Sequence, residues 1–299
     1  MRAHCSVMLP RMASKPSVAI VGPGNFGRAL AMAMRSAGIQ VQVIVAPPRG
    51  RSLEKAKMLA RQVRARATVQ PGEVKAELVW LCVPDSEIAR AARSFAATGS
   101  WKGRVALHSS GALTSDELDP LRRRGAVVAS VHPLMTFVGR GKPELRGIPF
   151  AIEGDRSAVR AARKIVTALG GRAYPIRKKD KAAYHAWGTF ASPLLTALLA
   201  ATEQVASLAG ISGEAARRRM IPILRQTLTN YAQFGAARGF SGPIIRGDVE
   251  TVKRHLQVLR RISAAREVYI ALARAALEYL PAKNKKDLSS LIARRTDIG

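Results

Sequence analysis

Residues 17–27 read SVAIVGPGNFG, and this stretch decides the fold of the N-terminal half. Residues 18–21 are a short apolar run typical of a buried strand, and residues 25–37 carry a helical pattern that stops at Gly38. The glycines between them form a G-x-G-x-x-G pattern placed directly after a strand and at the start of a helix, which favours binding of a dinucleotide. Gly22 would permit the tight turn, Gly24 would let the backbone approach a pyrophosphate, and Gly27 would allow close helix packing. The predicted cofactor loop is Gly22, Pro23, Gly24, Asn25, Phe26 and Gly27.

The rest of the N-terminal half alternates between strand and helix patterns. Further strands are predicted at 41–45, 78–83, 105–107, 127–131, 150–152 and 172–176, with helices at 54–65, 86–97 and 158–169. This rhythm predicts an α/β fold with a doubly wound parallel sheet of the Rossmann type. Beyond the charged stretch 177–181, helices are predicted at 183–208, 213–236 and 249–280, the last capped by Asp248. We therefore expect an N-terminal extension (1–16), an NAD(P)-binding Rossmann domain (17–177) and a mostly α-helical domain for substrate binding and dimerisation (178–299).

Composition narrows the class of protein. The chain has 299 residues, of which 47% are hydrophobic, enough to predict a globular protein. Its longest apolar stretch, residues 190–201, is too short to predict a membrane span. Cys5 and Cys82 have no disulfide-type or zinc-type spacing, so we expect free thiols in a cytoplasmic protein. The five histidines are scattered singly, and no metal site is predicted.

The formal net charge is +29, and so positive a field attracts polyanions. The basic residues are spread along the chain without interleaved aromatics or a known nucleic-acid motif. An arginine-rich solvated surface is therefore the favoured interpretation, and a basic nucleic-acid-associated protein on a Rossmann scaffold is an alternative.

The loop after the second strand bears on which nucleotide is bound. An NAD site usually has an acidic residue there for the ribose hydroxyls, but this chain continues as Ala46-Pro-Pro-Arg49-Gly-Arg51-Ser52. Two guanidinium groups and a hydroxyl suit the 2′-phosphate of NADP. Arg49, Arg51 and Ser52 therefore predict NADP(H) in preference to NAD.

Three further strand ends are expected to face the nicotinamide, because ligands bind at the carboxyl edge of such sheets. Val83, Pro84 and Asp85 follow one strand, although Asp85 or Ser86 would equally serve as a plain helix cap. His108-Ser109-Ser110-Gly111 and His132-Pro133 follow two others. In the helical half, Lys181 precedes a helix on which His185, Thr189 and Ser192 would share one face.

Together these motifs resemble a bacterial family of Rossmann-like oxidoreductases that carry a dedicated helical C-terminal domain and belong to the 6-phosphogluconate-dehydrogenase-like class. The resemblance covers about residues 17 to 265 and includes Tyr184-His185-Ala186, Phe190-Ala191-Ser192 and Gly242-Pro243 with Arg246-Gly247-Asp248. More distantly the chain is similar to ketopantoate reductase, pyrroline-5-carboxylate reductase and deazaflavin-dependent NADP oxidoreductases. Where the family commonly has Ser-Asn, this chain has Ser192-Pro193, so its substrate is expected to differ.

The resemblance and the motifs imply an NADP(H)-dependent oxidoreductase that reduces a small keto or imino acid, with ketopantoate as one candidate and a deazaflavin as another co-substrate. Hydride transfer leaves an oxygen or nitrogen that needs a proton donor, for which His185 is the first choice and Lys181 the second. Arg246 would clamp a carboxylate, or else pair with Asp248. The alternatives are a catalytically inactive NADP-binding regulator and the nucleic-acid-associated protein. The remaining predicted contacts are Val83, Pro84, Asp85 and Ser109 for the cofactor, and Ser110, His132, Ser192 and Arg246 for the substrate of a homodimeric enzyme.

Overall fold

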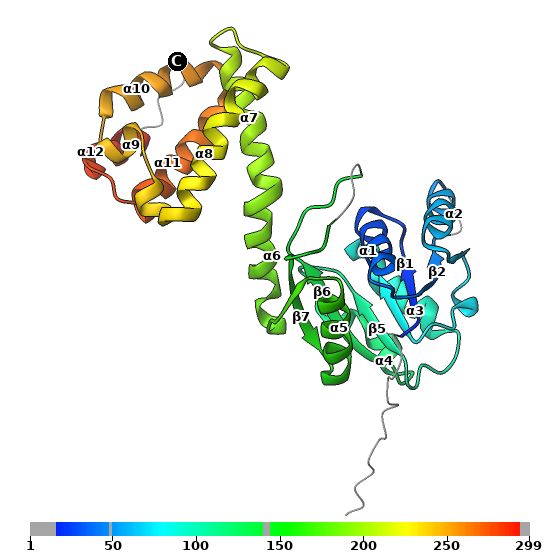
Figure 1. Ribbon diagram of the computed structural model, residues 1–299. Coiled ribbons are helices and arrows are strands. Elements are labelled where there is room, and N and C mark those ends of the chain that lie inside the picture. Colours follow the sequence, from blue (N-terminus) through cyan, green and yellow to red (C-terminus); the bar gives the residue numbers. More distant parts are fainter. Residues whose placement is uncertain (1–15, 48–49, 140–143, 294–299) are drawn as a thin grey trace, which may run out of the picture. The chain divides into compact units, whose positions relative to one another are not determined.

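The computed structural model describes residues 16–47, 50–139 and 144–293 of the chain (Figure 1). These residues form two compact units, one that runs to Thr189 and one that begins at Phe190. Within the three ranges, no helix combines the length and the apolar character needed to cross a membrane.

An eight-stranded sheet forms the first unit, in the order β3-β2-β1-β4-β5-β6-β7-β8. Neighbouring strands from β3 to β6 are parallel, and the order of the first six strands is that of a doubly wound sheet. The predicted Rossmann fold is therefore confirmed. Of these eight strands, the short β3 is the one that the sequence patterns did not predict. The strands are β1 (Val18–Val21), β2 (Val41–Val45), β3 (Arg66–Thr68), β4 (Leu78–Leu81), β5 (Val105–His108), β6 (Val127–Pro133), β7 (Pro149–Gly154) and β8 (Arg172–Pro175).

The sheet departs from the predicted parallel pairing at one place within the described residues, the pairing of β6 with β7. These strands are antiparallel, with Ala129 opposite Gly154 and Pro133 opposite Phe150. A parallel return needs a crossover of a dozen or more residues, usually a helix, and residues 134–139 and 144–148 contain none. Because β8 is parallel to β7, the carboxyl ends of β7 and β8 lie on the opposite edge of the sheet from those of β1 to β6.

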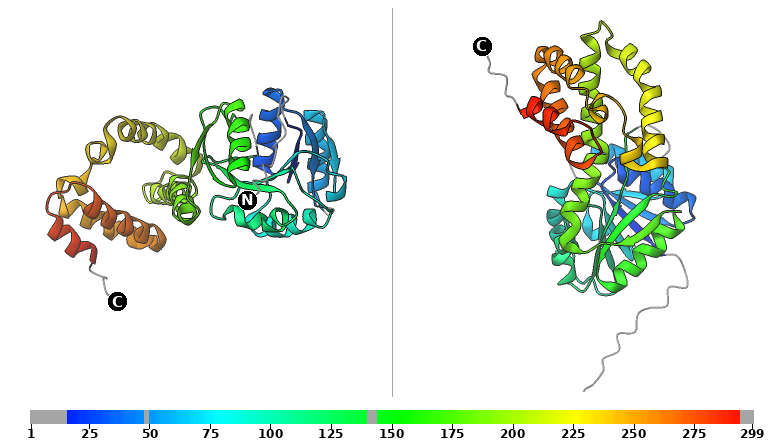
Figure 2. Two further views of the ribbon diagram at one scale, coloured as in Figure 1. Left: turned by 90° about the horizontal axis from the view of Figure 1, so that it is seen from below. Right: turned by 90° about the vertical axis from the view of Figure 1, so that its left-hand side faces the viewer.

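Helices cover both faces of this sheet, as Figure 2 shows. One buried cluster joins the sheet to α1, α2 and α5, and another joins it to α3 and α4. Every residue of β1 and β4 is buried, as expected for central strands covered on both faces. The helices of this unit are α1 (Asn25–Ser36), α2 (Ser52–Val63), α3 (Asp85–Ala96), α4 (Asp119–Arg122), α5 (Arg156–Ala168) and α6 (Lys181–Thr189), with short 3₁₀ turns at Pro71–Glu73, Ser115–Leu118 and Lys178–Asp180.

The second unit is helical, which confirms the expected fold class. Its small core is formed by Val252, Leu256, Ala273, Leu277, Leu288 and Ile292. Helix α7 packs against α8 and α11. The helices are α7 (Leu195–Ser207), α8 (Gly213–Gly239), α9 (Pro243–Arg246), α10 (Val249–Val258), α11 (Ser263–Tyr279) and α12 (Lys285–Ala293), with a 3₁₀ turn at Leu259–Arg261.

The prediction of a single helix over 249–280 is wrong. The chain leaves the helical region at Ile262 (φ −140°, ψ 88°), so α10 and α11 are separate helices, and α12 was not predicted. The predicted cap at the start of α10 is confirmed, because the Asp248 side chain accepts a hydrogen bond from the backbone N–H of Thr251.

The predicted helix over 183–208 is interrupted by a π-helical segment, Phe190–Leu194, which contains Pro193. Proline has no backbone N–H and its ring clashes with the carbonyl one turn earlier, and widened π turns are one way in which a helix accommodates this. Ser192 lies in the widened segment. The α-helical spacing used to place Ser192 on one face with His185 and Thr189 therefore does not hold there.

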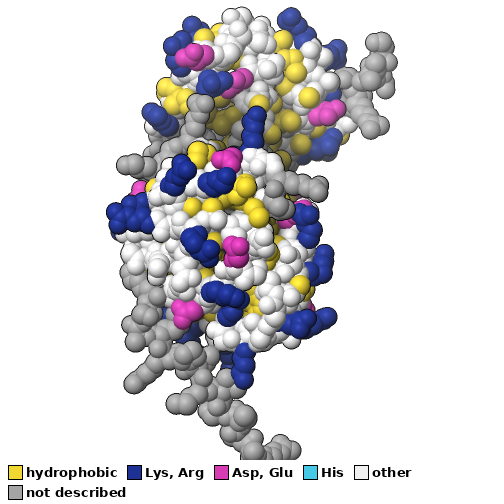
Figure 3. Space-filling model, turned by 90° about the vertical axis from the view of Figure 1, so that its right-hand side faces the viewer, with side chains coloured by type: hydrophobic (Ala, Val, Ile, Leu, Met, Phe, Trp, Pro, Cys, Tyr) yellow, Lys and Arg dark blue, Asp and Glu magenta, His cyan; other side chains and the backbone are white. Residues whose placement is uncertain are grey.

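Lysine and arginine side chains are scattered over the face drawn in Figure 3, with fewer acidic side chains among them. This distribution agrees with the spread of basic residues along a sequence of net charge +29.

Candidate functional site

The glycine loop between β1 and α1 has the geometry expected for a dinucleotide site. Gly22 has φ +102°, and a Cβ atom there would lie 2.5 Å from the backbone oxygen of Cys82. A Cβ at Gly27 would lie 2.0 Å from the backbone oxygen of Gly22. Both positions therefore require glycine for reasons internal to the protein. Gly24 differs, because a Cβ there would meet no described atom within 4 Å.

The N-terminus of α1 is prepared for an anion. Gly24 is the N-cap and provides no side chain, and the first turn contains no acidic residue. The first hydrogen bond of the helix joins the backbone N–H of Arg28 to the oxygen of Gly24, so the N–H groups of residues 25–27 have no acceptor within the helix. With the open space at Gly24, this arrangement fits the pyrophosphate of a dinucleotide, as the motif predicts.

The end of β2 carries no carboxylate in its described residues 46, 47 and 50–52. Ser52 begins α2, with the exposed Arg51 at the N-cap position. Arg49 lies outside the described residues.

The end of β4 places Asp85 in the first turn of α3 but not as its cap. Pro84 occupies the N-cap position and makes no side-chain cap bond, so the alternative that Asp85 or Ser86 is a plain cap is wrong. One carboxylate oxygen of Asp85 instead accepts a hydrogen bond from the Ser110 hydroxyl at 2.8 Å. Asp85 thereby links the ends of β4 and β5.

A cleft of about 160 Å³ lies next to the glycine loop. Its walls come from the loop and from the carboxyl ends of β4, β5 and β6, where parallel sheets bind ligands. Burial raises the pKa of the Cys82 thiol in this wall far above its usual value, so the group stays protonated. The lining residues are Phe26, Cys82, Val83, Ser109, His132, Pro133, Met135 and Phe137, and they include four that the sequence predicted to bind ligand, namely Phe26, Val83, Ser109 and His132.

The segment after β6 contacts the glycine loop, which the sequence did not indicate. The side-chain amide of Asn25 donates a hydrogen bond to the backbone oxygen of Phe137 at 2.9 Å. The rings of Phe26 and Phe137 lie 5.1 Å apart, and Phe26 also meets Trp80 edge-on at 6.5 Å. Asn25 and Phe26 are thus held by the protein itself.

The histidine and serines after β5 are held by hydrogen bonds in the interior. The Trp80 indole N–H donates to the Ser109 hydroxyl at 2.8 Å. His108 is fully buried, its Nδ1 accepts from the backbone N–H of Ser110, and its Nε2 lies 2.9 Å from the oxygen of Thr114. These partners require a neutral ring with the proton on Nε2. Burial lowers the pKa of His108 to about 4, so His108 is a structural residue.

Lys181 is 1% exposed and joins the loop after β5 to the middle of β6. Its Nζ donates to the backbone oxygen of Ser110 at 3.0 Å and to the hydroxyl of Ser130 at 2.6 Å. Burial lowers the pKa of Lys181 to about 8, an effect that the carboxylates of Glu153 and Asp85 partly oppose. The sequence patterns missed Ser130, which lies in the middle of β6, and Glu153, which lies at the carboxyl end of β7.

Two imidazoles meet beside the cleft. The rings of His132 and His185 are 6.0 Å apart, and His132 Nδ1 shares a 3.0 Å hydrogen bond with the hydroxyl of the buried Tyr184. A side chain at Gly111 would collide with both rings, 2.5 Å from His185 and 2.9 Å from His132. Burial, and then the charge of Lys181, lower the pKa of His132 to about 4. His132 is therefore neutral, and the exposed His185 is the imidazole of the pair that is open to solvent.

Two predicted substrate residues, Ser192 and Arg246, belong to the second unit. Ser192 lies in the π-helical segment and Arg246 ends α9. Ser110 is in the first unit, but its hydroxyl already donates to Asp85 and accepts from the N–H of Leu113. Across the residues that the structure describes, no three His, Cys, Asp or Glu side chains gather as a metal site would require.

Comparison with known proteins agrees with this two-part architecture. A family model described as a Rossmann-like domain matches residues 7–133, and a model described as a domain of unknown function, DUF2520, matches residues 148–276. The expected pairing of a Rossmann domain with a dedicated, uncharacterised C-terminal domain is thereby confirmed. The sequence matches no curated protein.

Solved structures share the fold at low identity. A candidate NADP oxidoreductase from Bacteroides fragilis has a TM-score of 0.74 at 20% identity, over 87% of this chain and 97% of the other. A reductive aminase from Aspergillus terreus, in complex with NADPH and ethyl-5-oxohexanoate, has a TM-score of 0.65 at 17% identity, over 93% and 99%. A pyrroline-5-carboxylate reductase from Coxiella burnetii has a TM-score of 0.55 at 15% identity, over 92% and 99%. The expected likeness to pyrroline-5-carboxylate reductase thus holds for the fold, which this chain shares with all three structures.

Proposed function

We propose that the protein is an NADP(H)-dependent reductase of a small keto or imino acid. The observation that carries this proposal is that a cleft lies next to the glycine loop, whose free N–H groups suit an anion. The wall of the cleft includes the neutral His132, and the exposed His185 packs against His132. The similar structures add support, since one of them holds NADPH with a keto ester and another is named for a cyclic imino acid.

The nucleotide would lie along the glycine loop, with its pyrophosphate at the N-terminus of α1. Arg51, Ser52 and, from the sequence, Arg49 would bind the 2′-phosphate of NADP, for which guanidinium groups are well suited. The lack of a carboxylate in the described residues after β2 favours NADP over NAD.

When bound, the nicotinamide supplies the hydride. His185 would give a proton to the oxygen or nitrogen of the reduced group, since imidazoles exchange protons near neutral pH. His132 and Tyr184 would orient the reacting group at the neighbouring wall of the cleft.

Lys181 would act as a positioning residue. Its Nζ is bound to Ser110 and Ser130, and its 1% exposure keeps it from substrate unless those bonds open, so it remains the second choice as proton donor. For the second unit, we propose that Arg246 clamps a substrate carboxylate and that Ser192 contacts the substrate. Pro193 in place of the usual asparagine would alter which acid is accepted.

A titration with NADPH and NADH, followed by nicotinamide fluorescence, tests the cofactor. An Arg49→Ala, Arg51→Ala double variant should weaken NADPH about tenfold or more, the order expected for lost charged hydrogen bonds, and leave NADH nearly unchanged. An Arg90→Ala, Arg93→Ala variant on α3 removes the same charge elsewhere and should bind both nucleotides as the wild type does. If neither nucleotide binds the wild type, the proposal fails.

Turnover is then screened with keto acids, ketopantoate first, with and without ammonia, and with a deazaflavin. A His185→Asn variant should lower kcat by about 10² or more at unchanged NADPH affinity, as for loss of a general acid. Tight NADPH binding without turnover of any of these compounds would favour the alternative of an inactive NADP-binding regulator.

We also propose that the protein is a homodimer formed through α8. This segment, whose backbone leaves the helical region at Gly235 (φ 74°, ψ 175°), buries only Ala216, and its exposed apolar side chains include Ile223 at 68%, Leu228 at 60% and Tyr231 at 62%. Packing of an apolar face supplies most of a helix's stability, so such a face indicates a partner, and a second copy is the simplest one. A Leu228→Glu, Tyr231→Glu variant should be monomeric by light scattering, while the control variant Met58→Glu on α2 should stay dimeric. A wild-type protein that is monomeric at micromolar concentration would contradict the proposed homodimer.

A further inference from the structure

The first unit has a second hollow, a cleft of about 680 Å³ at the carboxyl ends of β7 and β8. Arg156, Arg160 and Arg163 of α5 and Lys178 line it. Because β7 runs antiparallel to β6, this cleft opens on the edge of the sheet opposite to the glycine loop. The crossover from β7 through α5 to β8 is a strand-helix-strand unit of its own, and its cleft lies where such units bind ligands.

The three arginines are spaced so that they lie on one face of α5, at i, i+4 and i+7. All three are exposed, and none forms an ion pair with a described acidic residue. The positive charge of this face is therefore not balanced within the described chain.

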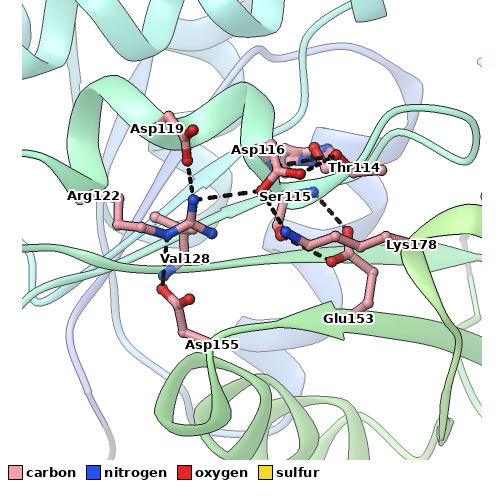
Figure 4. Close-up of polar contacts among 10 residues, drawn as sticks. Thr114, Ser115, Asp116, Asp119, Arg122, Val128, Glu153, Asp155 and Lys178 are labelled. Atoms are coloured by element: carbon pink, nitrogen blue, oxygen red, sulfur yellow. Dashed lines mark hydrogen bonds and ion pairs between the residues drawn. The ribbon is translucent and has the colours of Figure 1, made fainter.

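The nearby carboxylates are already engaged by other groups, as Figure 4 shows. Asp155 accepts hydrogen bonds from Arg122 and from the backbone N–H of Val128. Both oxygens of Glu153, which also lines the cleft and is 6% exposed, accept from Ser115. Asp116 pairs with Lys178 and Arg122, so Lys178 is partly neutralised and the arginines are not.

The floor of the cleft is apolar. Ile152, Val159, Pro175 and Ile176 line it between the strand ends and the helix. A ligand that fills the cleft would accordingly carry an apolar or aromatic part for this floor together with anionic groups for the arginine row.

We infer that this cleft binds an organic polyphosphate, a compact molecule with several linked phosphates and an aromatic or apolar group. The guanidinium fork matches phosphate oxygens bidentately, and seven helical residues span about 10 Å, which suits a chain of phosphates better than a single one. Nucleic acid is the less suitable occupant, because these three arginines line a cleft of about 680 Å³, a volume suited to a compact ligand, whereas a duplex is bound through phosphates spread along its length.

Calorimetric titration with ATP and with tripolyphosphate at 0.15 M salt tests the inference, since that salt screens long-range attraction to the overall charge. The wild type is expected to bind ATP more tightly than tripolyphosphate, which cannot contact the apolar floor. An Arg160→Gln, Arg163→Gln variant should weaken ATP about tenfold or more, as for loss of charged hydrogen bonds. An Arg93→Gln, Arg123→Gln variant removes the same charge from α3 and from the residue that follows α4, and it should bind as the wild type does.

Three results would overturn the inference. Equal ATP affinity in the wild type and the α5 variant would mean that ATP binds elsewhere, for example at the glycine loop. An equal loss in both variants would mean that only net charge matters. Binding of duplex DNA that the α5 variant loses, with no ATP binding to the wild type, would identify the cleft as a nucleic-acid contact. Urea unfolding of the α5 variant should match that of the wild type, which shows that the variant is folded alike whether or not the glycine loop binds a nucleotide.

Discussion

Replacing Gly24 by alanine separates the cofactor role of the glycine loop from its structural role. The backbone at Gly24 has φ −71° and ψ −173°, which alanine adopts without strain, and its Cβ would meet no described atom within 4 Å. Alanine reduces the freedom of the unfolded chain but is a poorer N-cap than glycine, so the free energy of unfolding should change by less than about 1 kcal/mol. Stability alone should not reveal this substitution.

Cofactor binding should be affected strongly, because the same Cβ would occupy the space through which the backbone approaches the pyrophosphate. Displacing the phosphate from two N–H groups at the start of α1, each worth about 1.5–3 kcal/mol for a charged acceptor, would cost roughly 3–6 kcal/mol. The Kd for NADPH should rise about 10²-fold to 10⁴-fold.

Nicotinamide fluorescence gives the Kd, and urea unfolding gives the stability. Gly72→Ala is the matched control, because a Cβ there also meets nothing within 4 Å. Gly27→Ala should lose stability as well as binding, since its Cβ would lie 2.0 Å from the oxygen of Gly22. A Gly24→Ala protein that binds NADPH within about threefold of wild type would refute the placement of the pyrophosphate.

Three further predictions concern stability. The free energy of unfolding should fall as the pH drops from about 6.5 to about 4, because His108 and His132 have folded pKa values of about 4 and take up protons more readily when unfolded. Urea unfolding should show a shallower decline with pH for His108→Asn than for the wild type. A decline as steep as that of the wild type would contradict the lowered pKa of His108. Lys181 has a folded pKa of about 8 against a usual 10.5, so it contributes a rise in the free energy of unfolding as the pH increases between those two values. The difference in unfolding free energy between the wild type and Lys181→Met should therefore change between these two pH values. A constant difference would show that Lys181 does not titrate in this pH range. Asp248→Ala should destabilise the second unit by about 1 kcal/mol, because the N-cap hydrogen bond from the backbone N–H of Thr251 is lost. Asp248→Asn should retain most of the stability, since asparagine also caps helices well. Equal thermal unfolding of the two variants would argue against the cap.

Local signals in the sequence predicted the Rossmann domain well. The buried strand before Gly22, the helix that contains Gly27 and the cap at Asp248 depend on neighbours a few residues away, and such features can be inferred without tertiary information. The break at Ile262 carries no glycine or proline, so periodicity alone extended one helix through it. Strand β3 is a short edge strand with the polar sequence Arg-Ala-Thr, which lacks the apolar run used to find the others.

The buried part of the site depends on pairings between distant segments. Ser130 lies in the middle of β6, and its role is visible only when Lys181, 51 residues later, reaches its hydroxyl. Likewise Gly111 appears in the sequence as a loop residue, yet it must be glycine because two imidazoles pack against it. No periodicity or spacing rule encodes such contacts.

The reversal of direction between β6 and β7 also bears on the order in which the sheet can form. Pro133 and Phe150 are only 17 residues apart in the chain, whereas Val18 and its β4 partner Leu78 are 60 apart. Closing the shorter loop costs less conformational entropy, so the antiparallel pair should nucleate ahead of the central parallel strands. The strand that contributes His132 to the cleft beside the glycine loop would then be in place before that loop is assembled.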